Sequence, residues 1–304
     1  FYYTENQDAF INALRGLTSP RFRIAVPIET ENTSWAAFGQ MDYALTDRMT
    51  LVGGLRYTKD EKTRTAGVGF GAEGGPLPPL TVAVNIGSED QWSKVTGKLG
   101  VNYTLSEEAM VYASWSRGYK AGGFNTTQTD SYDPETVDAY ELGLKSQWLD
   151  NRVQANIAAY YYDYKDKQDI QQISAPGQLL MRALRNASSA KVKGVELEVQ
   201  ALITDGLSLD FSLGYLNAEF DEYITFDPLF PVLGDQDLSG HKLSYSPEWT
   251  AHLGAQYEWD LGDNFGHLTA RTDYSWVDSR WTNAFNRLGG GIIQGAEGDF
   301  LPDY

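Results

Sequence analysis

Alternation of apolar and polar side chains, residue by residue, runs through long segments of this chain. In LSLDFSLGY (207–215) apolar residues occupy every odd position, with serine, aspartate or glycine between them. Successive side chains of a β-strand point to opposite faces of a sheet, so this pattern predicts a strand with one apolar and one polar face. The same alternation predicts ten further strands, the first of them partial: 1–5, 33–45, 49–59, 94–105, 109–120, 136–148, 152–164, 192–201, 249–259 and 267–276.

The connections between these predicted strands alternate in length. Short polar turns are expected at 46–48, 106–108, 150–151, 204–206 and 262–264. Long loops rich in glycine, proline and aspartate are expected near 6–31, 60–90, 121–134, 165–190, 218–246 and 278–304. An up-and-down meander with turns at one end and long loops at the other has this arrangement, which is typical of outer-membrane barrels.

The apolar face could pack against a second sheet or face lipid, and two features favour lipid. The predicted strands are about ten residues or longer, close to the ~9–11 residues that span a bilayer. Tyrosine and tryptophan lie near the ends of the apolar rows, where membrane interfaces favour them: Tyr43, Tyr57, Tyr103, Trp148, Tyr161, Tyr215, Trp259 and Trp276. We therefore predict an all-β fold, a transmembrane antiparallel up-and-down β-barrel.

Composition excludes several classes of protein. The net charge of −17 argues against a nucleic-acid partner, because phosphate binding needs a basic surface. The absence of cysteine excludes disulfides and thiolate metal sites. A membrane sheet must close, and eleven strands with abrupt ends cannot close it, so we expect residues 1–304 to be part of one barrel domain. Further strands are expected on both sides.

The segment VYASWSRGYKAGGFN (111–125) resembles a sequence seen repeatedly in TonB-dependent outer-membrane receptors, as do 35–62, 134–168, 186–201 and 237–259. The resemblance implies a bacterial outer-membrane barrel of the 22-strand class with an N-terminal plug. It also implies energy from the TonB–ExbB–ExbD complex, reached through the plug. Neither the plug nor the C-terminal strands are recognised in this sequence, and no cofactor is expected.

Candidate ligand contacts lie where strands leave the predicted membrane. Arg117, Tyr119 and Lys120 end one strand, and Phe124 and Asn125 follow a pair of glycines. The two cations are expected to meet lipopolysaccharide phosphates or an anionic substrate, against the simpler interpretation of strand-end anchoring. The loop aromatics are expected either to stack on a flat ligand or to pack among themselves: Phe230, Trp281 and Phe285.

Two groups of acidic residues are candidates for metal binding or acid–base chemistry. Asp235, Asp237 and Ser239 resemble half of a calcium loop, but the twelfth position is serine, so an acidic turn is favoured over a metal site. Glu141, Glu196 and Glu198 share the polar face. Ion pairs with arginines of the plug are favoured for them over acid–base catalysis, because alternation alone does not place two carboxylates across a pocket.

The sequence therefore predicts an active importer that performs no covalent chemistry, with a ferric siderophore as the default solute. Three alternatives stay open: import of carbohydrate or another nutrient, a passive porin, and a soluble β-sandwich that binds carbohydrate.

Overall fold

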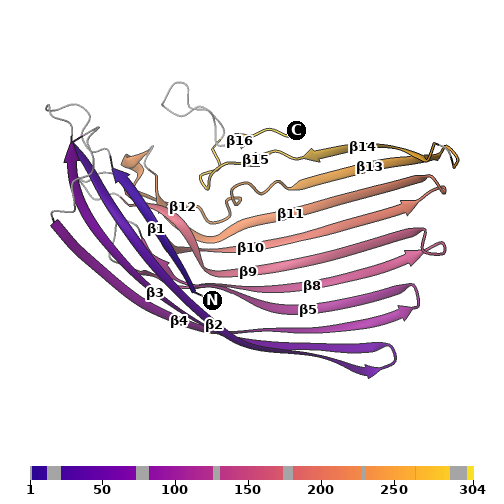
Figure 1. Ribbon diagram of the computed structural model, residues 1–304, viewed down its shortest axis with the longest axis horizontal. Coiled ribbons are helices and arrows are strands. Elements are labelled where there is room, and N and C mark those ends of the chain that lie inside the picture. The colour runs from indigo at the N-terminus through magenta and orange to yellow at the C-terminus, as the bar shows by residue number, and fades with distance from the viewer. Residues whose placement is uncertain are drawn as a thin grey trace.

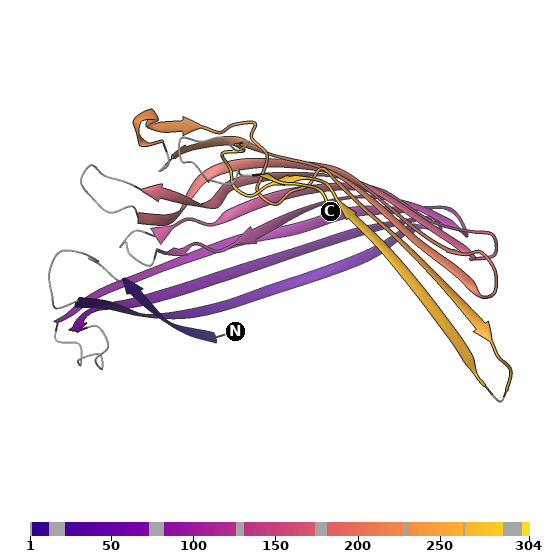
Figure 2. The same ribbon diagram turned by 90° about the horizontal axis from the view of Figure 1, so that it is seen from above.

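The computed structural model shows one large antiparallel sheet that curves along its width (Figures 1 and 2). It describes residues 2–11, 22–72, 82–125, 131–173, 181–227, 230–263, 265–287 and 300–304. The sheet order is β1-β2-β3-β4-β5-β8-β9-β10-β11-β13-β14, with β12 paired to β11. These strands are β1 Tyr2–Ile11, β2 Phe22–Thr46, β3 Met49–Ala72, β4 Val82–Ser106, β5 Ala109–Lys120, β8 Glu135–Trp148, β9 Val153–Ile173, β10 Met181–Leu202, β11 Leu207–Phe226, β12 Asp235–Asp237, β13 Trp249–Asp260 and β14 His267–Val277.

Four short strands form two small sheets, and the described chain has one short helix. Strands β6 (Gly123–Phe124) and β7 (Ser131–Tyr132) pair with each other, as do β15 (Arg280–Trp281) and β16 (Phe300–Leu301). The helix is η1, Pro231–Leu233, a single 3-10 turn. In the described ranges, no helix has the length and apolar character that crossing a membrane requires.

The up-and-down meander predicted from the sequence is confirmed. Each of the eleven strands on the main path pairs antiparallel with its neighbour in chain order, and β1 and β14 are the two edges of the described sheet. All five predicted short turns lie at the same end (Figure 1). The turn after β8 is tight, with positive φ angles at Leu149, Asp150 and Asn151.

Several predicted long loops are wrong, because the strands continue through them. Strands β3 and β4 pair as far as Val68 and Val82, with a register shift after Ala66, and β9 and β10 pair as far as Ile173 and Met181. Segments such as KDEKTRT (59–65) carry polar residues on both faces. Above a membrane both faces of a hairpin are solvated, so alternation is not needed and its signal disappears.

The register joins the alternating positions into two continuous faces. One cross-strand row is apolar through nine strands: Tyr43, Leu51, Val101, Ala113, Leu142, Ala159, Val195, Tyr215 and Trp249. A row on the opposite face is mostly polar: Thr104, Met110, Lys145, Asn156, Glu198, Ser212, His252 and Ser275.

The apolar face is not covered by a second layer. Leu55 is 68% exposed, Leu99 61% and Leu142 61%. Pairs of aromatic side chains border this face on the side away from the short turns. Their ring centroids lie 5.3 Å apart for Trp35–Tyr57 and 4.8 Å apart for Tyr215–Trp249. Tyr257 and Trp259 form a further pair toward the turns. An uncovered apolar band between aromatic borders is the outer surface of a membrane barrel.

Glycines on the polar face make room for tyrosine rings on the neighbouring strand. Gly143 lies directly across from Tyr112, and Gly194 from Tyr160. A Cβ atom added at either glycine would meet the facing tyrosine at less than 3.0 Å. Each tyrosine ring therefore covers the glycine backbone, which fixes the ring against the sheet and supports the register.

The orientation of the faces predicts unequal tolerance of charge at adjacent positions. Leu213 pairs with Leu197 and Ala251 on the apolar face, whereas Ser212 pairs with Glu198 and His252 on the polar face. Leu213→Arg should cost about 2–4 kcal/mol near the bilayer midplane and reduce assembled receptor, while Ser212→Arg should assemble normally. Heat-modifiable mobility of outer-membrane fractions measures assembly. Equal assembly of the two variants would contradict the assignment of the faces.

The tyrosine–glycine contacts predict a second difference. Gly143→Ala should lower the free energy of unfolding by about 1–3 kcal/mol through overpacking against Tyr112. Gly53→Ala, where an added Cβ meets nothing within 4 Å, should have little effect. Denaturant unfolding in lipid vesicles compares the variants. The Gly143→Ala and Tyr112→Ala changes should also be non-additive; additive costs would show that the ring does not depend on the glycine.

Candidate ligand-binding site

The segment 121–133 connects β5 to β8, two strands that end earlier than the strands on either side of them. Strands β5 and β8 end together at the Lys120–Glu135 pair. On either side, β4 continues to Val82 and β9 to Ile173. The described parts of the segment, 121–125 and 131–133, include β6 and β7 and bond to the longer strands on both sides.

Side-chain amides attach this segment to β9 and β10. Asn125 is buried; its Nδ2 donates to the Leu184 carbonyl at 2.9 Å, and its Oδ1 accepts the Leu184 N–H at 2.6 Å. The Nε2 of Gln168 donates to the carbonyls of Ala121 and Asp133, both at 3.0 Å. These bonds replace the backbone hydrogen bonds between strands that β5 and β8 no longer supply here, because a buried backbone group needs a partner.

The other side of the segment meets β3 and β4 through cations and aromatic rings. Arg64 donates to the carbonyl of Asn125, and its guanidinium lies 5.9 Å from the Phe124 ring centroid. The Phe124 and Trp92 centroids are 6.2 Å apart, and the Lys62 ammonium lies 5.8 Å from the Trp92 ring. We call Lys62, Arg64, Trp92 and Phe124 the basic–aromatic cluster.

The two cations of the cluster make no direct ion pair with a described carboxylate, although the charge of Asp60 acts on Lys62 from a greater distance. Arg64 is 3% exposed, and its Nε has no hydrogen-bond partner. Burial lowers the pKa of Arg64, and burial also lowers the pKa of Lys62. In the part of the chain that the structure describes, no carboxylate lies within 4.0 Å of either cation. An anionic group is the complement that these two cations lack.

Three of the predicted contact residues are already paired. Arg117 makes a two-point ion pair with Asp138, at 2.8 and 2.6 Å. The Tyr119 hydroxyl donates to Asp60 at 3.0 Å, and the Lys120 ammonium lies 3.7 Å from Glu135. The contacts of Arg117 and Lys120 cross the adjacent strands β5 and β8, as strand-end anchoring requires.

Two of the predicted loop aromatics enclose an arginine. The guanidinium of Arg287 lies 5.0 Å from the Phe230 ring centroid and 4.6 Å from that of Phe285. Its Nη2 pairs at 2.7 Å with Asp227, which is 1% exposed. Trp281 packs on Phe300 instead, with centroids 5.0 Å apart. Phe230 and Phe285 therefore contribute to packing between the connections after β11 and β14.

The second of these connections also touches the small apolar core of the loops. Phe285 packs against the buried residues Phe220, Tyr223 and Leu238. Lys242 and Asn286 exchange two hydrogen bonds, at 2.6 and 3.1 Å. The two connections are thereby joined over the end of the sheet.

The acidic stretch considered for calcium forms a local turn. Asp235 and Asp237 belong to β12, and both Ser239 N and Ser239 Oγ donate to the same Asp237 oxygen, at 2.9 and 2.6 Å. These bonds lower the pKa of Asp237. The three residues are not among the groups of metal-ligating side chains that converge in the described ranges.

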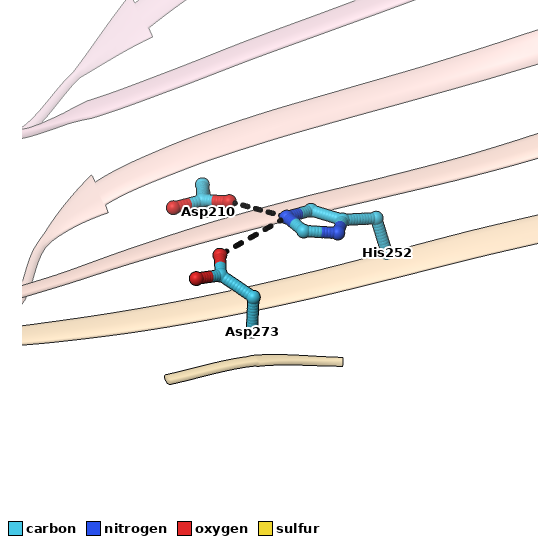
Figure 3. A group of neighbouring side chains, drawn as sticks. All are labelled: Asp210, His252 and Asp273. Atoms are coloured by element: carbon cyan, nitrogen blue, oxygen red, sulfur yellow. Dashed lines mark hydrogen bonds and ion pairs between the residues drawn. The ribbon is translucent and has the colours of Figure 1, made fainter. Parts of the chain in front are cut away.

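A converging group lies elsewhere, on the polar face of β11, β13 and β14 (Figure 3). The His252 Nε2 lies 3.0 Å from Asp210 and 3.6 Å from Asp273. Arg271 Nη2 is 3.0 Å from Asp210 and 2.6 Å from Asp273, and the other nitrogen of His252 contacts Ser275. Since a guanidinium already occupies the carboxylates, this group is an ion-pair network in the structure described.

Lys62 and Arg64 were not predicted as site residues because 60–90 was predicted as a loop, and Trp92 lies between that loop and the predicted strand 94–105. Lys62 and Arg64 continue the face that Arg56 and Thr58 begin, but the polar residues on the other face of 59–65 hide this parity in the sequence. Phe124 and Asn125 were chosen, and the structure brings both to Arg64.

Known proteins place this chain in a family. The family described as TonB dependent receptor-like, beta-barrel matches residues 1–304. The pesticin receptor of Yersinia pestis is 26% identical over 297 residues, which cover 94% of this chain and 39% of that protein. The ferric-pyoverdine 358 receptor of Pseudomonas putida is 28% identical over 138 residues, covering 45% of this chain and 17% of that protein.

Solved structures share the fold. The ferric yersiniabactin uptake receptor FyuA of Yersinia pestis has a TM-score of 0.66 at 19% identity, covering all of this chain and 45% of that one. The closed form of the ferric-catecholate import receptor Fiu of E. coli K12 has a TM-score of 0.61 at 19% identity, covering 95% and 39%. The chain thus spans less than half the length of these relatives. It belongs to the family of TonB-dependent receptor β-barrels, which are transport receptors of the bacterial outer membrane.

Proposed function

We propose that this chain is part of the barrel of a receptor that imports a ferric siderophore across the outer membrane. The observation that carries the proposal is the basic–aromatic cluster, where two cations without a carboxylate partner lie beside two aromatic rings. Iron chelates are flat in part and often anionic, so rings and cations together complement them. The names of the relatives, receptors for ferric pyoverdine and ferric yersiniabactin among them, support the same class of solute.

In this proposal the whole of residues 1–304 belongs to one barrel domain. A plug and further strands complete the receptor, and the TonB–ExbB–ExbD complex supplies energy through the plug. Lipid and lipopolysaccharide cover the apolar face and its aromatic border. The chain itself carries out no covalent step: it provides the wall and part of the ligand site. In that site Phe124 and Asn125 lie beside Arg64. Arg117, Tyr119 and Lys120 anchor the end of β5 that leads to it. Phe230, Trp281 and Phe285 stay candidate contacts from other connections, where they pack on Arg287 and Phe300.

Import of carbohydrate or another nutrient, and passive diffusion, are the alternative functions. A neutral carbohydrate leaves Lys62 and Arg64 without a complement. A porin transports its solute without an energised membrane. Radiolabelled iron uptake by a strain that expresses only this receptor separates these cases: siderophore-bound iron should enter under iron limitation, and a protonophore should abolish entry. Uptake that persists with the protonophore would contradict active import.

The cluster predicts how binding responds to one charge. Lys62→Gln should weaken the affinity for an anionic ferric chelate about fivefold to tenfold, roughly 1–1.4 kcal/mol, because one ammonium is lost beside the ligand. Lys59→Gln is the matched control: it lies on the same strand, on the opposite face, and is paired with Glu61 at 2.6 Å. Fluorescence quenching by the chelate measures both affinities. Equal affinities of the two variants would exclude Lys62 from the site.

A further inference from the structure

Two aspartates and a histidine converge on the polar face of β11, β13 and β14 (Figure 3). In the register, Asp210 and Asp273 lie directly across from Gly254, one on each side of it. His252 is the next residue of β13 on the same face. Side chains on one face of adjacent strands are neighbours, so three side chains that are able to bind a metal ion meet at one place in the sheet.

Gly254 leaves the space that the group occupies. A Cβ atom added there would meet both Asp210 carboxylate oxygens at 2.5 Å and Arg271 Nη2 at 2.6 Å. A larger residue at this position would therefore push Asp210 away from His252. The convergence depends on paired strands and on one glycine, and no loop takes part in it.

The separations between the side-chain atoms are close to those around a metal ion. His252 Nε2 lies 3.0 Å from Asp210 Oδ2 and 3.6 Å from Asp273 Oδ1. Each of the three residues offers one atom, and these atoms all lie within 4.8 Å of one another. Nitrogen and oxygen ligands bind zinc at about 2.0–2.2 Å, so two neighbouring ligand atoms lie about 3–3.5 Å apart.

Arg271 occupies only part of the two carboxylates. Its Nη2 contacts Oδ1 of Asp210, whereas Oδ2 of Asp210 faces His252. The same nitrogen donates to Oδ1 of Asp273 at 2.6 Å, but a carboxylate oxygen has two lone pairs and also has room for a metal ion. Carboxylates that bind a metal are usually held by such hydrogen bonds, so Arg271 is a positioning residue for both.

The other side of the imidazole is held as well. His252 Nδ1 lies 2.9 Å from Ser275 Oγ, which accepts a hydrogen bond when Nδ1 carries the proton. In that tautomer the lone pair of Nε2 points toward the two carboxylates. Histidines that bind a metal almost always have such a partner on the second ring nitrogen. A cavity of about 560 Å³ borders Asp210 and Arg271 and gives a small ion access to the group.

We propose that Asp210, His252 and Asp273 bind a divalent transition-metal ion, for which Zn²⁺ is the best match. Imidazole suits zinc, copper, iron and nickel, whereas Ca²⁺ and Mg²⁺ take oxygen ligands. Water completes the coordination, as in zinc sites with three protein ligands. The ion joins three adjacent strands on their polar face. The site shares no residue with the basic–aromatic cluster, so it does not rest on which solute is imported.

The experiment measures Zn²⁺ binding to the full-length, untagged receptor in detergent, after a chelator has removed bound metal. Competition with a fluorescent zinc indicator gives the affinity and the number of ions bound. The ligand variants are His252→Gln and Asp210→Asn. His267→Gln is the matched control, because His267 is a histidine of β14 that lies 3.3 Å from a single carboxylate, that of Glu258. Heat-modifiable mobility shows which variants assemble.

The unchanged receptor and His267→Gln should share a Zn²⁺ site that each ligand variant loses or binds at least about tenfold more weakly. Ser275→Ala keeps all three ligands and removes only the partner of Nδ1, so it should weaken binding by about tenfold. This variant tests the site even where a ligand variant does not assemble. With Cu²⁺ as a second probe, electron paramagnetic resonance should detect a nitrogen ligand in the unchanged receptor and not in His252→Gln.

Two results would overturn the proposal. One is that the unchanged receptor binds no Zn²⁺. The other is that His252→Gln, Asp210→Asn and Ser275→Ala bind it with the affinity and stoichiometry of the unchanged receptor. In either case the group is an ion-pair network only. Because none of these measurements follows iron uptake, failure of the metal site and failure of the proposed import function are distinguishable.

Discussion

Backbone hydrogen bonding between neighbouring strands is the interaction on which this structure depends. In a bilayer no water is present to satisfy an unpaired N–H or C=O group, so each strand must pair along its membrane-spanning length. Eleven strands do so here in simple chain order. The pairing fixes the register, and the register in turn decides which side chains meet lipid and which face the interior. The apolar row and the polar row are both consequences of that ladder.

The membrane-spanning half of the fold could be predicted from sequence because its two faces meet different solvents. Each of the five short turns and each apolar row was predicted, since lipid on one side makes alternation obligatory. The extension of the hairpins beyond the membrane could not be predicted, because segments such as 59–65 are solvated on both faces. Lys62, Arg64 and Trp92 lie in these extensions, so they were not predicted as site residues. Contacts between residues far apart in the chain, such as Asn125 with Leu184, depend on where strands end. They leave no pattern in the local sequence.

Charge on the polar face is divided among the strands. Cations without close acid partners gather on β3 beside the segment 121–133, while two carboxylates and an imidazole converge on β11, β13 and β14. The two sites have opposite complements. A ligand that needs Lys62 therefore has no reason to bind at Asp210.

Strands β5 and β8 are shorter than their neighbours, and this has a consequence for how such receptors diversify. The segment that connects them is attached mainly by amide side chains, so its length can change without moving any strand of the sheet. Insertions and deletions in natural variants should therefore accumulate at this position, and the neighbouring strands should keep a constant length. New specificities can arise there by exchange of one short stretch of chain.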